Sequence, residues 1–359
     1  MKVALVYDRV NKWGGAERVL LALHELFPEA PLYTSVYNAE SSSWAKVFRI
    51  IPSFLQQMPL AKKSHELYPL FMPGAFESFQ FDEYDLVISV TSEAAKGIIT
   101  KPHTLHLCYC LTPTRYLWSG YQEYFTTKFS RLLAFPGISY LKKWEKVGST
   151  RPDAYIAIST EVQERIRNYY DRSATLIHPP VSLVGEKKKF GKRKDYYLVV
   201  SRLVSYKRID LAIRACNQLN KKLVIVGSGS QEKKLRSIAG PTITFVGAVS
   251  EQELKEYYAT CKAFLFPGRE DFGITMVEAM SYGAPVIAYG QGGAKDIVLP
   301  NRTGILFDEQ NVESLVQALN QFGKMSFNQE VLTTQAALFS EEVFHTKIKA
   351  YLHKHFANF

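Results

Sequence analysis

The sequence has no long uninterrupted apolar run, and this absence excludes one class of protein. None of its windows approaches the ~20 consecutive apolar residues that a transmembrane helix requires. Its first residues, MKVALVYDRV, contain Asp8 and no small-residue cleavage site, so they predict a first strand rather than a signal peptide. We therefore expect a protein that is made and kept in the cytoplasm.

Cysteine is also scarce, with four residues in a chain of 359. Their positions follow no disulfide scaffold, which agrees with a reducing compartment. The alternation of His106, Cys108 and Cys110 could suggest a zinc site. We favour the other interpretation, in which these three side chains form one face of a buried strand.

Acidic residues are outnumbered, because 34 Asp and Glu face 44 Lys and Arg, which gives a net charge of +10. This excess favours an anionic partner, which could be a nucleotide-bearing substrate, a nucleic acid or an acidic membrane surface. Composition alone does not choose among them. The hydrophobic fraction of 47% and the charged fraction of 22% are typical of a folded globular enzyme and exclude a disordered tail.

Short apolar runs alternate with amphipathic segments along the chain, a pattern typical of a parallel sheet covered by helices. One series of strands ends near residue 180, and a fresh series begins at YYLVVS. Between them, GEKKKFGKRKD at 185–195 predicts a linker or an exposed edge loop. At roughly 150 residues per domain, the chain should form two Rossmann-like, doubly wound α/β domains, 1–180 and 181–359, with ligands bound at their strand ends. The last helix is expected either to stay with the second domain or to pack back on the N-terminal one.

Several strand ends carry residues suited to an anion. Gly15, within GGAER after the first strand, removes a side chain where a helix begins, although a plain turn is the alternative. Arg202 and Lys207 lie five residues apart in a loop before a helix. Two cations there could bind a diphosphate, and a solvated basic loop is the equally good alternative. Gly227 opens a turn in VIVGSGSQ that lacks the third glycine of a dinucleotide fingerprint, which disfavours a nicotinamide cofactor.

The stretch GREDFGITMVEAM at 268–280 gives the sharpest prediction. Glu270 precedes a short helix and Glu278 lies about one turn inside it, with Gly273 between them. A diphosphate would sit well on the free N–H groups at the helix start. One carboxylate could then hold a sugar and the other a ribose, which fits a nucleotide sugar. A favourable interaction with the helix dipole would explain Glu278 alone.

These stretches occur in a fixed order with several others: GGAER, CYCLTPTRYLW, SRLVSYKRID, FVGAVSEQEL, the two glutamates with seven residues between them, GQGGAKDIV and TGILF. In this order the chain resembles glycosyltransferase family 4, the retaining enzymes of the GT-B fold, whose two domains face a central cleft. It looks most similar to the bacterial mannosyltransferase-like branch that builds lipid-linked polysaccharides.

The resemblance implies a role for each candidate. The candidate catalytic residues are Glu270, which would contact the transferred sugar, and Arg202 and Lys207, which would neutralise the departing diphosphate. Glu278 would hold the ribose, the backbone near Val249 the base, and Gly15 the donor or the acceptor. The candidate donor-binding residues are Gly15, Gly227, Val249, Phe272, Gly273, Ile274, Thr275 and Glu278.

The family mechanism implied here needs no metal, because cationic side chains and helix amides take the charge of the leaving diphosphate. The absence of an Asp-x-Asp motif agrees with this expectation. The expected co-substrate is a nucleotide diphosphate sugar, with GDP-mannose favoured by similarity to the branch, and no cofactor or metal is expected.

The chain departs from the family at two positions. Leu111 stands where relatives usually have a histidine near the sugar, and Glu93 in TSEAAKG replaces a second histidine. A branch that uses backbone carbonyls and the donor phosphate instead is one explanation, and we favour it. Altered donor choice or lost activity is the other.

The resemblance implies a lipid-linked glycan acceptor bound by the N-terminal domain. Residues 115–151 mix seven cations with large aromatics such as Trp118, Phe129 and Trp144. This mixture suits an anionic membrane surface, so a peripheral location on the inner face of the cell membrane is expected. An ordinary helix with a core face is the alternative. Two further alternatives are a non-catalytic nucleotide-sugar sensor and a nucleic-acid-binding protein, but no nucleic-acid module is recognisable and no nucleic acid is expected as a partner.

Overall fold

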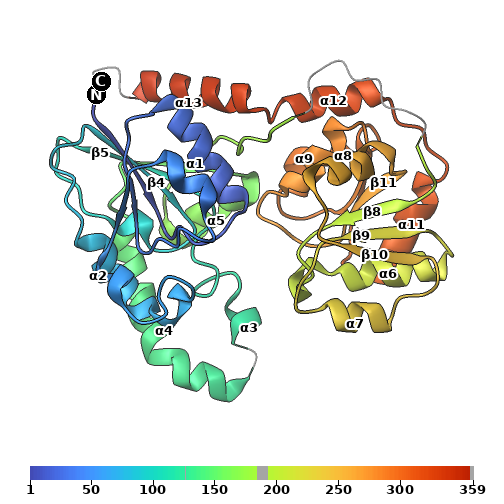
Figure 1. Ribbon diagram of the computed structural model, residues 1–359, viewed down its shortest axis with the longest axis horizontal. Helices are drawn as coiled ribbons and strands as arrows, with labels where there is room; N and C mark the ends of the chain where they lie inside the picture. The colour runs from blue at the N-terminus through green and yellow to red at the C-terminus, as the bar shows by residue number, and fades with distance from the viewer. Residues whose placement is uncertain (126, 184–192, 356–359) are drawn as a thin grey trace. The chain divides into compact units, whose positions relative to one another are not determined.

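The computed structural model describes residues 1–125, 127–183 and 193–355, and these form two compact units. Unit 1 is Met1–Pro180 together with the segment from Phe344, and unit 2 is Val181–Val343. Most of the predicted linker at 185–195 lies outside the described residues. Each unit is an α/β layer structure built on its own parallel sheet (Figure 1). The predicted fold class, two Rossmann-like doubly wound domains, is confirmed.

The sheet of unit 1 has the described strand order β3-β2-β1-β4-β5-β6-β7, with all neighbours parallel. The chain winds outward from β1 in one direction, then returns to β4 and winds outward in the other. β1 is buried at every position, as expected of a parallel strand covered on both faces. The strands are β1 Val3–Tyr7, β2 Leu32–Thr34, β3 Ile50–Pro52, β4 Leu86–Thr91, β5 Leu105–Cys110, β6 Ala154–Ala157 and β7 Thr175–Leu176.

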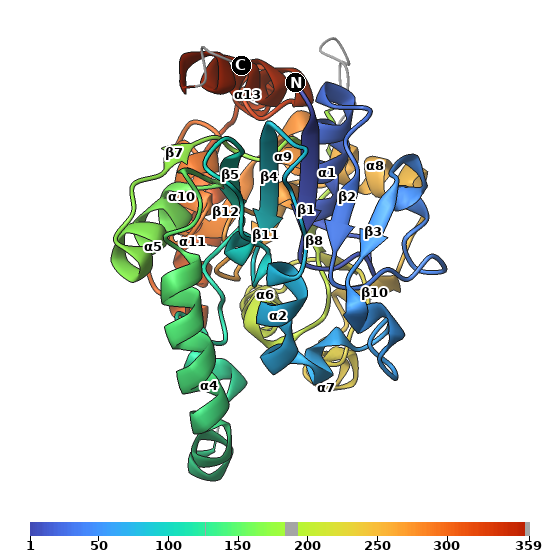
Figure 2. The same cartoon turned by 90° about the vertical axis from the view of Figure 1, so that its left-hand side faces the viewer.

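Helices cover both faces of this sheet (Figure 2). The α-helices that begin in unit 1 are α1 Gly15–Leu26, α2 Met72–Glu77, α3 Tyr121–Tyr124, α4 Lys128–Gly148 and α5 Thr160–Tyr170. Short 3-10 helices are η1 Ser43–Val47, η2 Phe54–Gln57, η3 His65–Leu67, η4 Pro69–Phe71 and η5 Ala95–Gly97. The N-terminal half of α4 projects from the body of unit 1 in both views (Figures 1 and 2).

The last described helix, α13 Glu341–His355, begins in unit 2 and continues in unit 1. The ring of Phe344 is buried and meets Tyr109 of β5 edge to face, with centroids 5.8 Å apart. A ring nitrogen of His345 lies 2.8 Å from the carbonyl oxygen of Ala22 in α1. The chain therefore returns to its N-terminal unit through apolar packing and a hydrogen bond.

Unit 2 repeats the same principle with the described strand order β10-β9-β8-β11-β12-β13. Its strands are β8 Tyr197–Val200, β9 Leu223–Val226, β10 Ile243–Gly247, β11 Ala263–Phe266, β12 Val286–Tyr289 and β13 Gly304–Phe307. Its helices are η6 Ser205–Lys207, α6 Ile209–Gln218, α7 Glu232–Ser237, α8 Glu251–Thr260, α9 Ile274–Ser281, α10 Ala294–Ile297, α11 Val312–Phe322 and α12 Gln329–Ala337. Ser250 and Glu253 form a capping box that fixes the start of α8.

The predicted buried strand at 105–110 is β5, and His106, Cys108 and Cys110 are all buried in it. The Nε2 atom of His106 lies 2.8 Å from the hydroxyl oxygen of Ser89 on the neighbouring strand β4. Burial lowers the pKa of His106 to about 3, and the positive charge of Arg151 contributes to this shift. His106 is therefore neutral in the folded protein.

This histidine should make unit 1 sensitive to acid. Because its pKa is about 6.5 in an unfolded chain and about 3 when folded, only the unfolded state gains a proton between these values. The free energy of unfolding should fall as the pH drops from 6.5, and His106 alone should account for about 2 kcal/mol of the loss at pH 5. His106→Gln should remove that part of the pH dependence.

The measurement is urea unfolding at pH 8 and pH 5, followed by tryptophan fluorescence. All four tryptophans, Trp13, Trp44, Trp118 and Trp144, lie in unit 1, so the signal reports this unit. A variant with the same loss of stability as the wild type between the two pH values would contradict the assignment.

Candidate functional site

The candidate residues of unit 2 gather at the carboxyl edge of its sheet, where β8 and β11 lie side by side. The strand order reverses between these two strands, since β9 and β10 follow β8 on one side while β12 and β13 follow β11 on the other. Such a switch point is where open α/β sheets bind ligands. The loop after β8 carries Arg202 and Lys207, and the loop after β11 carries Glu270.

Lys207 and Glu270 form an ion pair between these two loops. Both side chains are mostly buried, with 17% and 19% of their surface exposed. The Lys207 ammonium also lies 5.4 Å from the ring centroid of Tyr206, and the hydroxyl of Tyr206 accepts a 2.9 Å hydrogen bond from Arg202. The two predicted cations and the predicted sugar-binding carboxylate are therefore brought into one cluster.

Glycines make this cluster possible by letting main chains approach closely. Gly227 has a φ of +122°, and a Cβ atom there would collide with the carbonyl oxygen of Ser201, next to Arg202. A hydrogen bond of 2.9 Å from the N–H of Leu203 to the carbonyl of Ser228 joins the same two loops. The position of Gly227 thus supports the loop that presents Arg202.

Gly292 and Gly293, in GQGGAKDIV after β12, hold the main chain of Glu270. The N–H of Gly293 donates a 2.9 Å hydrogen bond to the Glu270 carbonyl, and a Cβ atom at Gly292 would collide with the same oxygen. We assigned no role to these glycines from the sequence. A glycine pair directly after an apolar strand is the signal that could have indicated one.

The loop that begins with Glu270 ends at α9, whose N-cap is Gly273 with a φ of +100°. Ile274 and Thr275 are the first residues of the helix, so their N–H groups have no acceptor within it. The ring of Phe272 is buried and packs against Phe339, with centroids 5.7 Å apart. The main chain is therefore the part of Phe272 that could reach a ligand.

Glu278 lies one turn into α9, as predicted, and its Oε2 atom accepts a 2.9 Å hydrogen bond from the hydroxyl of Tyr258 on α8. Val249 is half-buried in the loop between β10 and α8. α8 follows that loop directly, so Tyr258 links the helix after Val249 to the carboxylate of Glu278. The roles of base and ribose contact remain predictions for these two residues.

Gly15 lies in the other unit, where it is exposed as the first residue of α1 after β1. The hydroxyl of Tyr7, at the end of β1, donates a 2.7 Å hydrogen bond to the buried Glu17. This bond ties the first turn of α1 to the strand before it.

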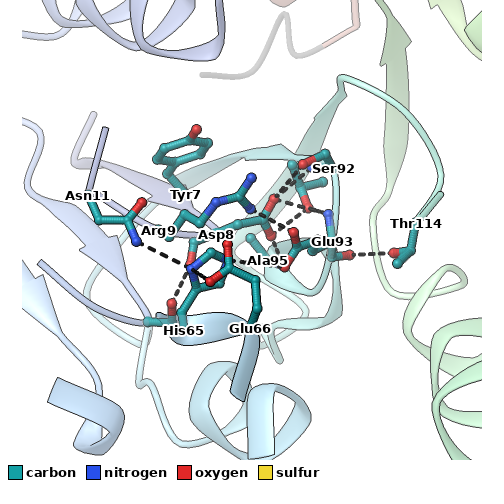
Figure 3. A network of polar contacts seen from close by, with 12 residues as sticks. Tyr7, Asp8, Arg9, Asn11, His65, Glu66, Ser92, Glu93, Ala95 and Thr114 are labelled. Carbon is teal, nitrogen blue, oxygen red and sulfur yellow. Dashed lines mark hydrogen bonds and ion pairs between the residues drawn. The ribbon is translucent and has the colours of Figure 1, made fainter. Parts of the chain in front are cut away.

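A second polar cluster lies at the carboxyl ends of β1 and β4, the switch point of unit 1 (Figure 3). Asp8 is fully buried, and its carboxylate accepts hydrogen bonds from the N–H groups of Ser92, Glu93 and Ala95 and from the Thr91 hydroxyl, at 2.7 to 3.0 Å. One carboxylate thus holds the whole turn after β4.

The Glu93 carboxylate, at the position where a histidine was expected from the family, forms a 2.7 Å ion pair with Arg9. His65 contributes a ring nitrogen 4.0 Å from the other carboxylate oxygen. Burial and the charge of Arg9 lower the pKa of His65 to about 4. We missed Arg9 and His65 in the sequence, although charged residues directly after an apolar strand, as in VALVYDR, were a usable signal for the first.

Comparison with known families finds a match in unit 2. Residues 184–337 match the family described as glycosyl transferases group 1. The matched segment is less than half of the chain and lies within unit 2. The match contains Arg202, Lys207, Glu270 and the α9 helix start, and it agrees with the resemblance to glycosyltransferase family 4 inferred from the motifs.

Curated relatives match a part of the chain. A "GDP-mannose-dependent alpha-mannosyltransferase" of Mycolicibacterium smegmatis is 40% identical over 121 residues, which is 33% of this chain and 32% of the relative. A "GDP-mannose-dependent alpha-(1-6)-phosphatidylinositol monomannoside mannosyltransferase" of Mycobacterium tuberculosis is 33% identical over 149 residues, or 36% of this chain and 38% of the relative. The chain thus spans about a third of the length of these relatives.

Solved structures match almost all of both units. The "lipopolysaccharide outer core galactosyltransferase WaaB apo form" has a TM-score of 0.69 at 19% identity, with 100% of both chains covered. Anabaena HepE in complex with UDP has a TM-score of 0.71 at 17% identity, covering 99% of this chain and 100% of that one. At these identities the likeness shows the fold, and it agrees with the two-unit architecture described above.

The two glutamates of the group 1 segment should differ in what they bind. Glu278→Gln should weaken the binding of GDP about tenfold, because it removes the charged acceptor that is expected to bind a ribose hydroxyl. Glu270→Gln should not weaken it, because this carboxylate is expected to contact the sugar that GDP lacks. Isothermal titration calorimetry with GDP measures both, with Glu256→Gln on the exposed face of α8 as the control. Equal losses of affinity in the two variants would count against these roles.

Proposed function

We propose that the chain is a retaining glycosyltransferase that moves a hexose from a nucleotide diphosphate sugar to a lipid-linked glycan acceptor. The observation that carries this proposal is the Lys207–Glu270 ion pair at the switch point of a glycosyl transferases group 1 segment. A cation for the leaving diphosphate and a carboxylate for the sugar hydroxyls are adjacent there, next to a helix start that suits an anion.

The residues suit a reaction in which the nucleotide diphosphate departs with its charge. Arg202, Lys207 and the N–H groups at the start of α9 would stabilise the negative charge that develops as the bond from the sugar to the diphosphate breaks. The acceptor hydroxyl would attack from the face that the diphosphate leaves and give its proton to a phosphate oxygen. The configuration of the sugar is then retained, with no protein nucleophile and no metal ion.

We propose GDP-mannose as the donor. The two relatives that are 40% and 33% identical carry "GDP-mannose-dependent" in their names. The HepE structures contain UDP or UDP-glucose but are 17 to 18% identical to this chain. Donor choice is set by a few side chains around the base and sugar, so the relatives with the higher identity are the better guide.

The proposed reaction predicts that the protein releases GDP from GDP-mannose when a bacterial lipid extract is present, and that excess EDTA does not stop it. Lys207→Ala should reduce the rate about 100-fold, the usual effect of removing one group that stabilises transition-state charge. Lys255→Ala, on the surface of α8, is the matched control for loss of a cation. The assay is coupled detection of GDP.

Two outcomes would contradict this prediction. Loss of activity in EDTA and its recovery with magnesium would exclude the cationic mechanism. GDP binding without any release from a nucleotide sugar would instead favour the non-catalytic sensor.

We further propose that the protein acts at an anionic membrane surface on the inner face of the cell membrane. No helix in the described part of the chain is both long and apolar enough to cross a bilayer. Four apolar residues of α4 are nevertheless 64 to 72% exposed, namely Phe129, Leu132, Leu133 and Phe135. We call these four residues the α4 apolar face. Exposed Lys128, Lys143 and Lys146 occur on the same helix and suit acidic headgroups.

The other aromatics of this stretch have partners within unit 1. Trp118 stacks on Tyr169 and donates a 2.8 Å hydrogen bond to Glu145, and Trp144 donates one of 2.7 Å to Glu77. Lys142 lies over the ring of Trp118, 5.3 Å from its centroid. The packed-helix alternative for residues 115–151 thus holds for these side chains, and we propose the membrane role for the α4 apolar face alone.

Membrane binding should depend on the α4 apolar face and on salt. The protein should co-sediment with vesicles that contain phosphatidylglycerol at low ionic strength, and less so at high ionic strength, because each cation contributes about 1 kcal/mol at an anionic surface. Replacing both Leu132 and Leu133 by Ser should weaken sedimentation about tenfold or more. Leu338→Ser, at an exposed leucine of unit 2, should not. Equal sedimentation of the double variant and the wild type would refute the proposal.

A further inference from the structure

Glu93 is held at the carboxyl edge of the sheet in unit 1 by contacts from several elements. Its N–H donates to Asp8 at 3.0 Å. Its carbonyl accepts hydrogen bonds from the ammonium of Lys96 and, at 3.3 Å, from the hydroxyl of Thr114. Its carboxylate is paired with Arg9. The main chain and the side chain of this residue are therefore both fixed.

The support extends into buried charge. The Lys96 ammonium, fully buried, lies 2.7 Å from Glu145 of α4, which is 1% exposed. Glu145 also accepts hydrogen bonds from Thr114 and Tyr170, both at 2.6 Å. These bonds compensate the charge of Glu145, and Lys96 holds its pKa below the ordinary value despite burial. Buried ion pairs contribute little net stability compared with apolar packing, so this framework is better explained by the need to hold the turn at Glu93 in one conformation.

One oxygen of the Glu93 carboxylate has no hydrogen-bond donor among the residues that the structure describes. Arg9 occupies Oε1 at 2.7 Å. Among the described ion-pair partners of Glu93, the one nearest to Oε2 is His65, whose Nε2 atom lies 4.0 Å away. This distance is too long for a hydrogen bond. The Glu93 side chain is 21% exposed, so a ligand can reach it. An ionised carboxylate accepts up to about four hydrogen bonds, and Glu93 lies just after β4, at the strand ends where α/β sheets bind ligands.

The charge around Glu93 suits a neutral donor of hydrogen bonds. The guanidinium of Arg9 already balances the carboxylate, and its Nε atom is buried without a described hydrogen-bond acceptor. Lys12 adds a further positive charge nearby, while Asp8 and Glu66 add negative ones. Neither a second cation nor an anion is needed to neutralise the site. A sugar hydroxyl supplies the hydrogen and little charge.

We propose that Glu93 binds a hydroxyl group of the acceptor sugar in unit 1, with Arg9 as the residue that positions its carboxylate. This inference rests on the proposed function, because it takes the ligand of unit 1 to be a glycan. It assigns the departure from the family at position 93 to acceptor recognition, whereas Arg202, Lys207 and Glu270 serve the donor.

The test separates sugar binding from catalysis. Methyl α-mannoside, a soluble monosaccharide, is titrated into the full-length protein in the presence of GDP, and binding is followed by saturation-transfer NMR. Glu93→Gln should weaken binding about tenfold, since a hydrogen bond to a charged acceptor is lost from an otherwise similar shape. Glu66→Gln is the matched control, because it neutralises a neighbouring carboxylate whose ion-pair partner among the described residues is the Nδ1 atom of His65, and it should bind as the wild type does.

The same variants are then assayed for release of GDP from GDP-mannose with and without the lipid extract. Glu93→Gln should raise the KM for the acceptor about tenfold while the affinity for GDP and the slow hydrolysis of the donor stay unchanged. If Glu93 had only a structural role, the variant would also bind GDP more weakly and hydrolyse the donor more slowly. Glu93→Asp, which keeps the charge but shortens the side chain, should fold if the amide variant does not, and it should also bind the mannoside more weakly.

The outcomes are distinguishable from failure of the proposed function. Suppose that the wild type binds the mannoside but transfers no sugar, and that Glu93→Gln loses mannoside binding. This result would support the sugar site at Glu93 and refute the proposed transferase activity. Transfer by the wild type with unchanged mannoside binding and unchanged acceptor KM in Glu93→Gln would refute the role of Glu93 alone. Absence of mannoside binding by the wild type would also overturn the inference.

Discussion

The ion pair between Lys207 and Glu270 is the interaction on which the site in unit 2 depends. Its two partners come from loops after β8 and β11, which are adjacent in the sheet but far apart in the sequence. Two mostly buried charges are tolerated together because each offsets the desolvation of the other. The same pairing places a cation beside a carboxylate at the switch point, where we propose that the diphosphate and the sugar of the donor bind. The Lys207–Glu270 ion pair therefore both joins the loops after β8 and β11 and forms the centre of the proposed donor site.

That contact requires main chains to pass closer than side chains allow. Gly292 and Gly293 bring the loop after β12 against Glu270, and Gly227 brings the loop after β9 against Ser201 beside Arg202. An alanine at any of these positions would push a loop away by collision with a carbonyl oxygen. Glycine has no Cβ atom, so it lets the two main chains approach each other. It affects the charged residues only through the position of their loops.

Unit 1 solves the equivalent problem with buried charge instead of glycine. Asp8 gathers the N–H groups of the turn after β4, and Lys96 connects the carbonyl of Glu93 to Glu145 in α4. Removing one member of such a network leaves an uncompensated charge, which costs several kcal/mol. The C-terminal part of α4 is thereby held against the turn, whereas its N-terminal part exposes Phe129 and Leu132. One helix thus has an anchored end and a free apolar end.

The sequence by itself determined the fold class, because the alternation of apolar runs and amphipathic segments is local information. It also predicted which strand ends carry charge, and it placed Glu278 inside a helix and Glu270 before it. It could not show that Lys207 meets Glu270, nor that Arg9 and His65 converge on Glu93, since strand order and register bring these residues together across tens of positions. It also left residues 115–151 undecided between core and membrane. Only the tertiary structure showed which of these side chains are buried and which are exposed, because burial depends on what packs against a helix face. An amphipathic pattern is the same whether its apolar side meets protein, solvent or lipid.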